Sequence, residues 1–370
     1  MISKMKFYST FIMSLSKTIT LSIIFFSLVI INVSAQKRYF YTNKPYGSEA
    51  LFNPITLLIN GGYDICQLQS VPNRITEPAY SKMLRTVLQN LGDPFPRIKA
   101  YGWSKFLRTE FLPLSFTVET MQWIPNYQQH LIGGGMLYTA MKEWYQEHGY
   151  PCSWLLSSIT LMSQHLFNEV METGPYEGYS VDEISDIYIF DLGGIVLFSF
   201  DSINEFFSKE LNLADWSLQA SVSLPMGRVN AGQYFSIKWK LPFSQDYSLF
   251  YRYGLGALWG LSKKVDSTDN FSFGLGFKTK HLVDLNSKFR ERTIETGWYA
   301  GVFYDRNNSL LASFVMSGIR EQFCMIDVYP GIIKMGNFSP GIWTVIGRNG
   351  RTTFGISTRY VFSLGAEINY

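Results

Sequence analysis

Residues 352–370, TTFGISTRYVFSLGAEINY, alternate apolar and polar side chains along nearly their whole length. Alternation with a period of two is typical of a β-strand that has one apolar and one polar face. Only Thr358 and Val361 are out of phase, and Gly355 and Gly365 carry no side chain. The predicted apolar face consists of Phe354, Ile356, Tyr360, Phe362, Leu364, Ala366, Ile368 and Tyr370. The pattern predicts one long terminal strand.

This predicted strand ends on Tyr370, an aromatic residue in phase with the apolar face. In this it resembles the C-terminal strand of bacterial outer-membrane β-barrels, whose apolar face meets lipid and whose polar face meets the lumen. The same period of two runs through much of the chain from Asp215 onward, for example in 216–224, 235–241 and 271–277. Counting such runs gives about eight strands, the size of the smallest membrane barrels. We therefore expect residues 215–370 to form an antiparallel transmembrane β-barrel filled with side chains.

The composition argues against a nucleic-acid partner, and the spacing of the cysteines does not decide whether any of them pair. Of 370 residues, 16% are charged and the formal net charge is +3, so we expect no nucleic-acid partner. Aromatic residues also make up 16%, which suits a protein with many rings at an apolar or interfacial surface. Cys66, Cys152 and Cys324 match no metal spacing. Cys66 and Cys152 could pair in an exported protein, but their spacing leaves this open.

The first 35 residues have the order of a cleavable secretory signal. Lys4, Lys6 and Lys17 precede an apolar run over 21–33, and small residues place the predicted cut after Ala35. An uncleaved membrane anchor is the alternative, although the run is short for a span. The signal predicts export, and with the barrel it predicts an outer-membrane location.

Between signal and barrel, the chain divides into two parts. We expect residues 36–99 to be an irregular lead-in with a short helix over 77–90, which two prolines then stop. Residues 100–214 are expected to form a periplasmic helical domain, with helices near 128–148, 153–173 and 181–210. Three consecutive glycines at 133–135 are costly inside a helix, so close approach of a neighbouring backbone is the expected reason for them. The overall fold class is therefore α+β.

Four polar side chains on these apolar helices are the candidate site residues: His130, His165, Glu169 and Asp186. His165 and Glu169 are four residues apart and so project from one helical face. Antiparallel packing of the short-looped helices would bring His130 and Asp186 toward that face. The cluster could be a general acid and base, it could hold a metal, or it could be a buried network that satisfies its own hydrogen bonds.

Familiar catalytic and nucleotide-binding motifs are absent from the sequence. It contains no Gly-x-Ser-x-Gly elbow, no phosphate-binding glycine loop and no His-Glu-x-x-His. We therefore expect no cofactor, and we assign no residue to a metal.

The helical part resembles a block found in uncharacterised exported proteins of the Bacteroidetes, and it is loosely similar to VanZ-like and YfiM-like helical proteins. The resemblance rests on HLIGGGM at 130–136, NE at 168–169, SVD at 180–182 and a segment that runs from Asp186 to DLGG. It covers about a quarter of the chain, and it implies no particular reaction. The barrel pattern that follows departs from the VanZ-like proteins.

Two functions follow as hypotheses, and a soluble secreted β-protein that binds a ligand is a third possibility. The first is an outer-membrane anchor or scaffold whose periplasmic helical domain binds outer-membrane lipid or an envelope protein. The alternative is an envelope lipid-modifying enzyme, an acyl hydrolase or transferase, that uses the cluster of His130, Glu169 and Asp186.

Overall fold

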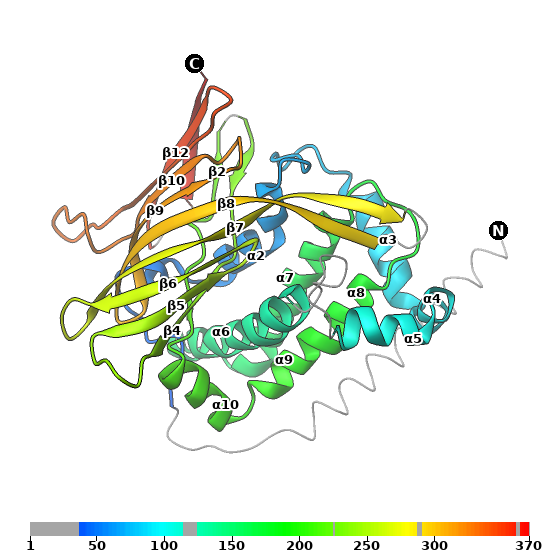
Figure 1. Ribbon diagram of the computed structural model, residues 1–370, viewed down its shortest axis with the longest axis horizontal. Coiled ribbons are helices and arrows are strands. Elements are labelled where there is room, and N and C mark those ends of the chain that lie inside the picture. Colours follow the sequence, from blue (N-terminus) through cyan, green and yellow to red (C-terminus); the bar gives the residue numbers. More distant parts are fainter. Residues whose placement is uncertain (1–36, 114–123, 225, 287–290, 360–362, 370) are drawn as a thin grey trace.

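The computed structural model describes residues 37–113, 124–224, 226–286, 291–359 and 363–369. The predicted signal, residues 1–35, and the terminal Tyr370 lie outside them. The chain folds as α+β, with helices from Ser48 to Glu210 and a large sheet after them (Figure 1). The helices of the described residues are η1 Ser48–Leu51, α2 Pro54–Gly62, η2 Asp64–Gln67, α3 Tyr80–Gly92, α4 Pro94–Tyr101, α5 Trp103–Phe106, η3 Leu107–Phe111, η5 Ile124–Gly134, α6 Gly135–Glu147, α7 Ser153–Thr173, α8 Asp182–Ser185, η6 Asp186–Asp191, α9 Leu192–Leu197, α10 Asp201–Glu205 and η7 Phe206–Glu210.

The lead-in is more helical than the sequence predicted. Asn53 and Pro54 lie in the segment expected to be irregular, but they start α2: the Asn53 side chain accepts hydrogen bonds from the backbone of Ile55 and Thr56, and Pro54 stands at the first helical position. Pro94 likewise begins α4 instead of ending the helical region. The expected helix over 77–90 is observed as α3.

The strands of the described residues are β1 Ala214–Asp215, β2 Ser221–Ser223, β3 Arg228–Asn230, β4 Phe235–Lys240, β5 Tyr247–Tyr253, β6 Gly256–Lys264, β7 Asp269–Asn286, β8 Glu291–Arg306, β9 Ser309–Ser317, β10 Cys324–Val328, β11 Gly341–Ile346, β12 Arg351–Ser357 and β13 Ser363–Asn369. They form one sheet in the order β1-β4-β5-β6-β7-β8-β9-β10-β11-β12-β13-β2-β3. From β4 to β13 every neighbour is antiparallel and next in sequence, whereas β13 pairs with β2 in parallel.

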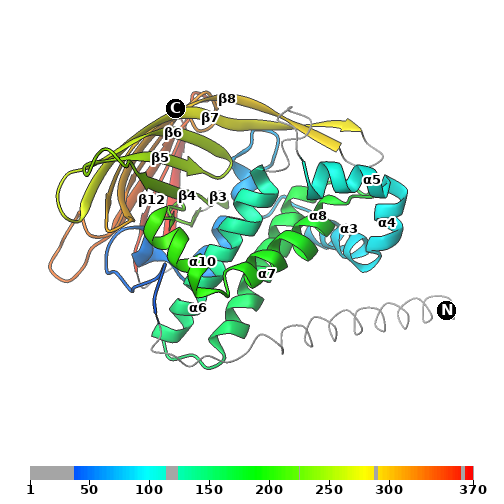
Figure 2. The ribbon, with the colours of Figure 1, turned by 60° about the horizontal axis from the view of Figure 1, so that its bottom comes forward.

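The expected barrel of about eight strands is wrong in strand number and in closure. The sheet has 13 strands in the described part of the chain and is not closed into a barrel. Both ends of the strand order nevertheless belong to one hairpin, since β1 and β2 are successive parts of 214–223, and β3 and β4 are successive parts of 228–240. One arm of this hairpin carries β1 and β2, and the other carries β3 and β4. Between the β1–β4 pair and the β2–β3 pair, the two arms are joined by isolated backbone hydrogen bonds, such as the one from Leu218 N–H to the Gly232 carbonyl. Irregular backbone at this hairpin therefore interrupts an otherwise strongly curved sheet (Figure 2).

The terminal pattern forms two strands instead of one. β12 and β13 are antiparallel partners, with Ile356 opposite Leu364 and Phe354 opposite Ala366. Thr358 follows β12, and Val361 lies outside the described residues. The apolar phase nevertheless continues from β12 to β13, because Ile356, Leu364 and Ile368 are all exposed on the sheet.

The outside of the sheet is apolar, and its inside carries both polar and apolar side chains. Along β7, Phe271, Phe273 and Leu275 are about half exposed, while the alternating Ser272 and Lys278 are fully buried. The same arrangement recurs across the sheet. The exposed apolar residues of strands β4 to β13 are Trp239, Tyr247, Leu249, Trp259, Leu261, Phe271, Phe273, Leu275, Val283, Trp298, Phe314, Ile326, Ile342, Phe354, Ile356, Leu364 and Ile368.

The inner face combines polar pairs with a cluster of buried hydrophobic residues that includes Phe250, Leu258 and Phe303. Lys238 Nζ lies 2.5 Å from Asp305 Oδ2, and Lys278 Nζ donates to the side-chain oxygens of Gln67 and Gln322. Trp216 is fully buried there. This face is therefore a packed interior with internal polar partners.

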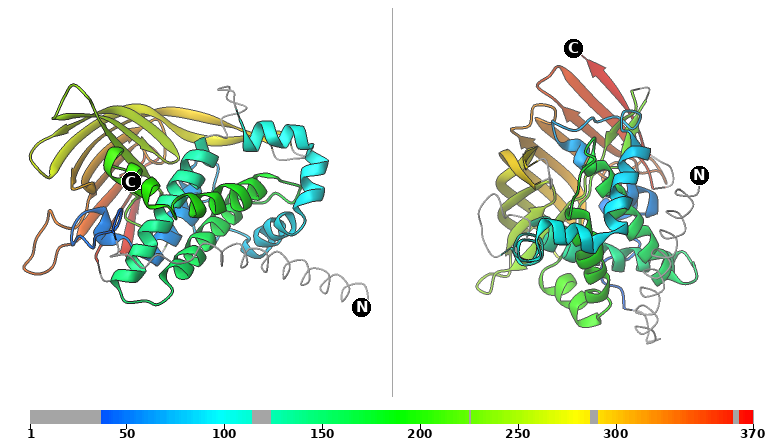
Figure 3. Two further views of the ribbon diagram at one scale, coloured as in Figure 1. Left: turned by 90° about the horizontal axis from the view of Figure 1, so that it is seen from below. Right: turned by 90° about the vertical axis from the view of Figure 1, so that its right-hand side faces the viewer.

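Helices and sheet share hydrophobic cores. Met136 of α6 and Leu161 of α7 pack with Phe235 of β4 and Tyr253 of β5. At the other end, the long β7–β8 hairpin runs past its neighbours toward α3–α5 (Figures 1 and 3), where Leu282 packs against a core built from α3, α7 and α8. This hairpin and the helices together enclose the space that holds the candidate site.

Candidate functional site

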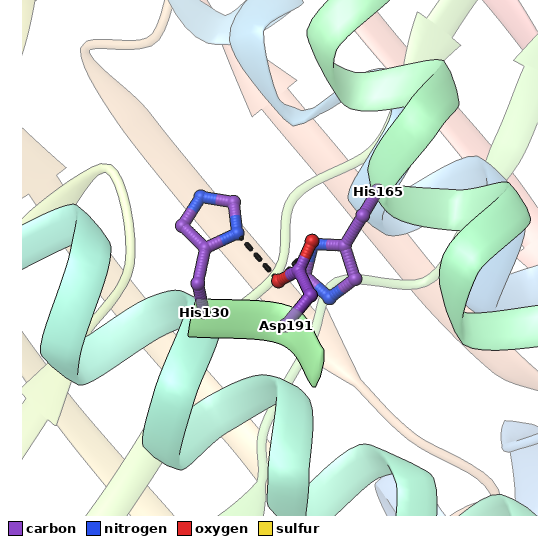
Figure 4. Close-up of side chains that lie close together, drawn as sticks. All are labelled: His130, His165 and Asp191. Atoms are coloured by element: carbon purple, nitrogen blue, oxygen red, sulfur yellow. Dashed lines mark hydrogen bonds and ion pairs between the residues drawn. The ribbon is translucent and has the colours of Figure 1, made fainter. Parts of the chain in front are cut away.

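His130 lies between two aspartates. Its Nδ1 is 2.9 Å from Asp191 Oδ1, and its Nε2 is 3.5 Å from Asp186 Oδ2 (Figure 4 shows the Asp191 contact). All three side chains are buried. Because Asp191 engages Nδ1, the opposite nitrogen of the ring faces Asp186.

Two π-helical stretches make this geometry possible. His130 is part of η5, and both aspartates are part of η6, in which Asp186 and Asp191 are the first and last residues. In a π-helix the hydrogen bond joins residues five apart, so residues with this spacing lie on one side of the helix. In an α-helix the same spacing would turn the two carboxylates well away from each other. The sequence predicted ordinary helices here and so gave no reason to group Asp191 with Asp186.

Helix α7 supplies the other two candidates. His165 and Glu169 are four residues apart and both buried, as their shared helical face predicts. Glu169 offers a carboxylate oxygen within 4.8 Å of ligand atoms of His130 and Asp186. His165 turns to the other side of the cluster, where its Nδ1 is 3.2 Å from Asp191 Oδ1 and its ring centre is 4.9 Å from that of His130. The structure thus brings all four candidates together, with Asp191 between the two imidazoles (Figure 4).

Glycines let the two helical segments approach closely enough for these contacts. A Cβ on Gly194 would lie 2.7 Å from the backbone oxygen of Leu131, and one on Gly135 would lie 2.8 Å from the Gly194 oxygen. The backbones of η5–α6 and α9 therefore touch at this crossing. This is the close approach that the glycine run predicted, and it sets His130 beside Asp191.

A cavity of about 150 Å³ adjoins the cluster. Its polar wall includes His130, Asp186 and Glu172, and apolar side chains such as Leu255 and Ile294 form the wall that belongs to the sheet. Asp64 also lines it, and the Asn168 side-chain amide donates to Asp64 at 2.8 Å. The cavity is therefore polar at the helices and apolar at the strands.

No protein-family model matches this chain, and no similar protein was found among curated proteins or solved structures. The resemblance to VanZ-like and YfiM-like proteins stays a prediction. The geometry of the site is therefore the basis for inferring a function.

The buried groups have pKa values displaced in opposite directions. Burial lowers the pKa of His130, but the adjacent Asp191 carboxylate outweighs it and the pKa rises to about 9. Burial lowers the pKa of His165 to about 4. Burial, and then the charge of a neighbouring carboxylate, raises the pKa values of Glu169 and Asp186 well above their usual range. Such opposed shifts within one cluster are typical of functional sites.

The cluster leaves several buried polar atoms without hydrogen bonds. Among the described residues, neither ring nitrogen of His165 makes a hydrogen bond, and Asp191 Oδ2 has no partner. A network that served only to hold the helices together would be expected to satisfy its own polar atoms. These atoms are open to a partner that the described residues do not supply.

Sequence reasoning missed two contributors to the site. Asp191 was missed because it follows Asp186 by five residues, and residues five apart lie on the same side of a helix only when the helix is a π-helix. Asp64 was missed because it lies in the predicted irregular lead-in, and no local signal connected it to a helix about 100 residues later. The three cysteines are free: Cys66 and Cys324 are buried, and Cys152 is exposed.

Proposed function

We propose that this protein is an outer-membrane enzyme that hydrolyses an ester bond of a membrane lipid, with its reaction centre at His130, Glu169 and Asp186. The observation that carries the proposal is the placement of His130: Asp191 holds one ring nitrogen, and the other faces Asp186 beside a cavity. A group held in this way has a fixed tautomer and orientation, which acid–base catalysis and water activation both need.

The chemistry uses a water bound between His130 and the two carboxylates. The water oxygen adds to the acyl carbon of the ester while a proton passes to the cluster. The carbon–oxygen bond to the alcohol then breaks, and the cluster returns the proton to the departing alkoxide oxygen. Asp191 is a positioning residue in this scheme, because it contacts His130 and not the reacting atoms.

The membrane location is supported by the apolar outer surface of the sheet. Exposed apolar side chains cover its outside from β4 to β13, while its inside holds a hydrophobic cluster together with buried lysines, aspartates and serines. A water-soluble sheet usually turns a polar face to solvent, so the apolar outside favours contact with lipid. Trp239, Trp259 and Trp298 are each about half exposed on this surface, where aromatic rings suit a membrane interface.

The substrate class follows from the cavity. Its helical wall carries the reacting polar groups and its strand wall is apolar. An amphiphile fits both walls: the ester lies against His130, and the first carbons of a chain lie along Leu255 and Ile294. At about 150 Å³ the cavity holds only the part of a lipid around the reacting bond.

None of the helices in the described ranges has both the length and the hydropathy to span a membrane.

The test compares lipid turnover by the full chain and by two histidine variants. His130→Ala removes the central ring, and His148→Ala removes an exposed histidine at the end of α6. Purified protein in mixed micelles of envelope lipids is assayed by mass spectrometry for released fatty acid. We expect the His130 variant to lose at least about 100-fold in rate, because general acid–base catalysis contributes on that scale, and the His148 variant to stay near wild type.

Equal rates for the two variants would refute the enzyme and favour the second function, an outer-membrane anchor or scaffold. The same apolar sheet surface supports that function, because it would hold the helical part at the envelope without any reaction. Folding of both variants is checked by their heat-dependent gel mobility.

A further inference from the structure

We propose that His130, Glu169 and Asp186 bind one divalent transition-metal ion, with Zn²⁺ as the best match. The inference deepens the proposed function and rests on it for the role of the metal, but the binding itself is independent of any reaction. The three residues come from η5, α7 and η6, so the ion would join three separate segments.

The spacing of the ligand atoms fits a tetrahedral ion. Two ligands about 2.1 Å from such an ion lie about 3.4 Å apart. His130 Nε2 and Asp186 Oδ2 are 3.5 Å apart, and Glu169 completes a set whose atoms all lie within 4.8 Å of one another. A small movement of the Glu169 side chain would close the set.

The other possible set, His130 with His165 and Asp191, fits less well. His130 Nδ1 and Asp191 Oδ1 are only 2.9 Å apart. That is a hydrogen-bond distance and too short for two ligands of one tetrahedral ion. Asp191 therefore belongs outside the ligand set.

The contact between Asp191 and His130 has the form expected around a bound metal. Metal-binding histidines almost always donate their second ring N–H to a carboxylate or carbonyl, which fixes the ring and raises its basicity. Here Asp191 accepts from Nδ1, and Nε2 points to the proposed ion. The ring is already arranged as a ligand.

Glu169 is an independent indication that a ligand belongs here. Its side chain is 3% exposed, and it makes no hydrogen bond or ion pair with the residues that the structure describes. A buried carboxylate without a partner is costly, and a cation would satisfy it. The cavity also gives the ion an open position for water, as in catalytic zinc sites.

A ligand set of one imidazole and two carboxylates also limits the choice of metal. Imidazole suits zinc and other transition metals, whereas Mg²⁺ and Ca²⁺ prefer oxygen ligands alone. We expect Zn²⁺ to bind, Mn²⁺ to bind more weakly, and Mg²⁺ not to compete at equal concentration. With the ion bound, Nε2 of His130 would be a metal ligand and could not take the proton; the ion itself would activate the attacking water by lowering its pKa.

The experiment measures Zn²⁺ binding to the full chain in detergent by calorimetry, after treatment with a chelator. Glu169→Gln and Asp186→Asn keep the size of each side chain and remove its charge. Glu177→Gln is the matched control, because Glu177 is exposed and lies outside the cluster. We expect one Zn²⁺ per wild-type chain and per control chain, and at least a tenfold loss of affinity in the other two variants.

Asp191→Asn separates the positioning role from the ligand role. Replacing a residue that orients a metal ligand usually weakens metal binding about 10- to 100-fold. We therefore expect this variant to keep one site with reduced affinity. Since these variants could be misfolded, gel mobility and circular dichroism are recorded for each.

The outcomes distinguish the two proposals. Stoichiometric Zn²⁺ binding without lipid hydrolysis upholds the metal site and overturns the enzyme. Lipid hydrolysis that depends on His130 in protein that binds no Zn²⁺ overturns the metal site and leaves the enzyme. Zn²⁺ binding that is equal in wild type and in folded Glu169→Gln also overturns the metal site.

Discussion

Replacing Gly194 by alanine should separate the helical segments that place His130 beside Asp191. The added Cβ would lie 2.7 Å from the Leu131 backbone oxygen, whereas ordinary contact begins at 3.4 Å. Since a backbone oxygen cannot rotate away, the segments must part by about 0.7 Å. Overpacking of this kind costs about 1–3 kcal/mol.

Gly193→Ala is the matched control. Its Cβ would meet only Leu131 Cδ1, at 3.1 Å, which is the end of a flexible side chain. Both glycines lie in α9, so both variants gain the same helix propensity of about 1 kcal/mol. The difference between their free energies of unfolding therefore isolates the backbone contact, and we expect Gly194→Ala to be less stable by about 1–3 kcal/mol.

The same displacement affects the site. Leu131 follows His130 directly, so a shift of about 0.7 Å would lengthen the 2.9 Å contact with Asp191 to about 3.6 Å, beyond hydrogen-bond range. Guanidinium unfolding in detergent, followed by circular dichroism, measures the stability difference, and calorimetry measures Zn²⁺ affinity. Equal stability and equal Zn²⁺ affinity of the two variants would refute the view that this glycine contact positions the site.

Two further predictions concern pH and the sheet surface. Burial, followed by the charge of Glu172, raises the pKa of Asp64 from 3.8 to about 8. The folded protein therefore holds the Asp64 proton more tightly than the unfolded chain does. As a result, the free energy of unfolding falls as pH rises from 3.8 to about 8. In chelator, Asp64→Asn should raise the melting temperature by more than about 4 °C at pH 8 and by much less at pH 5, which lies only about one unit above the usual pKa of an aspartate. Equal shifts at both values would contradict this assignment. On the outside of β7, Leu275→Lys should cost about 2–4 kcal/mol if this face meets lipid, and it should lower the folded fraction in the outer membrane. The control Leu155→Lys, on the exposed face of α7, should not lower it. Gel mobility of unboiled samples measures the folded fraction of both variants, and equal tolerance of the two lysines would argue against a lipid-facing sheet.

The sequence by itself determined the helices and strands that a regular side-chain period marks. The helix over 153–173 and the alternation in β6, β7 and β12 follow from side-chain period alone, because each turn of a helix or step of a strand is set by near neighbours. The glycine runs indicated a close backbone contact, and the shared face of His165 and Glu169 followed from their spacing. The α+β class was likewise evident from the change of period near Asp215.

Tertiary structure decided how these elements combine. The reversal that splits the terminal pattern into β12 and β13, the 13-stranded sheet and its parallel β13–β2 pairing depend on contacts between distant segments, which alternation does not specify. The site depends on two π-helical stretches that bring Asp191 to His130 and on a lead-in segment that brings Asp64 to α7. Periodicity tells which face a residue occupies, but only packing determines which faces meet, because the free energy that selects a partner comes from contacts far apart in the chain.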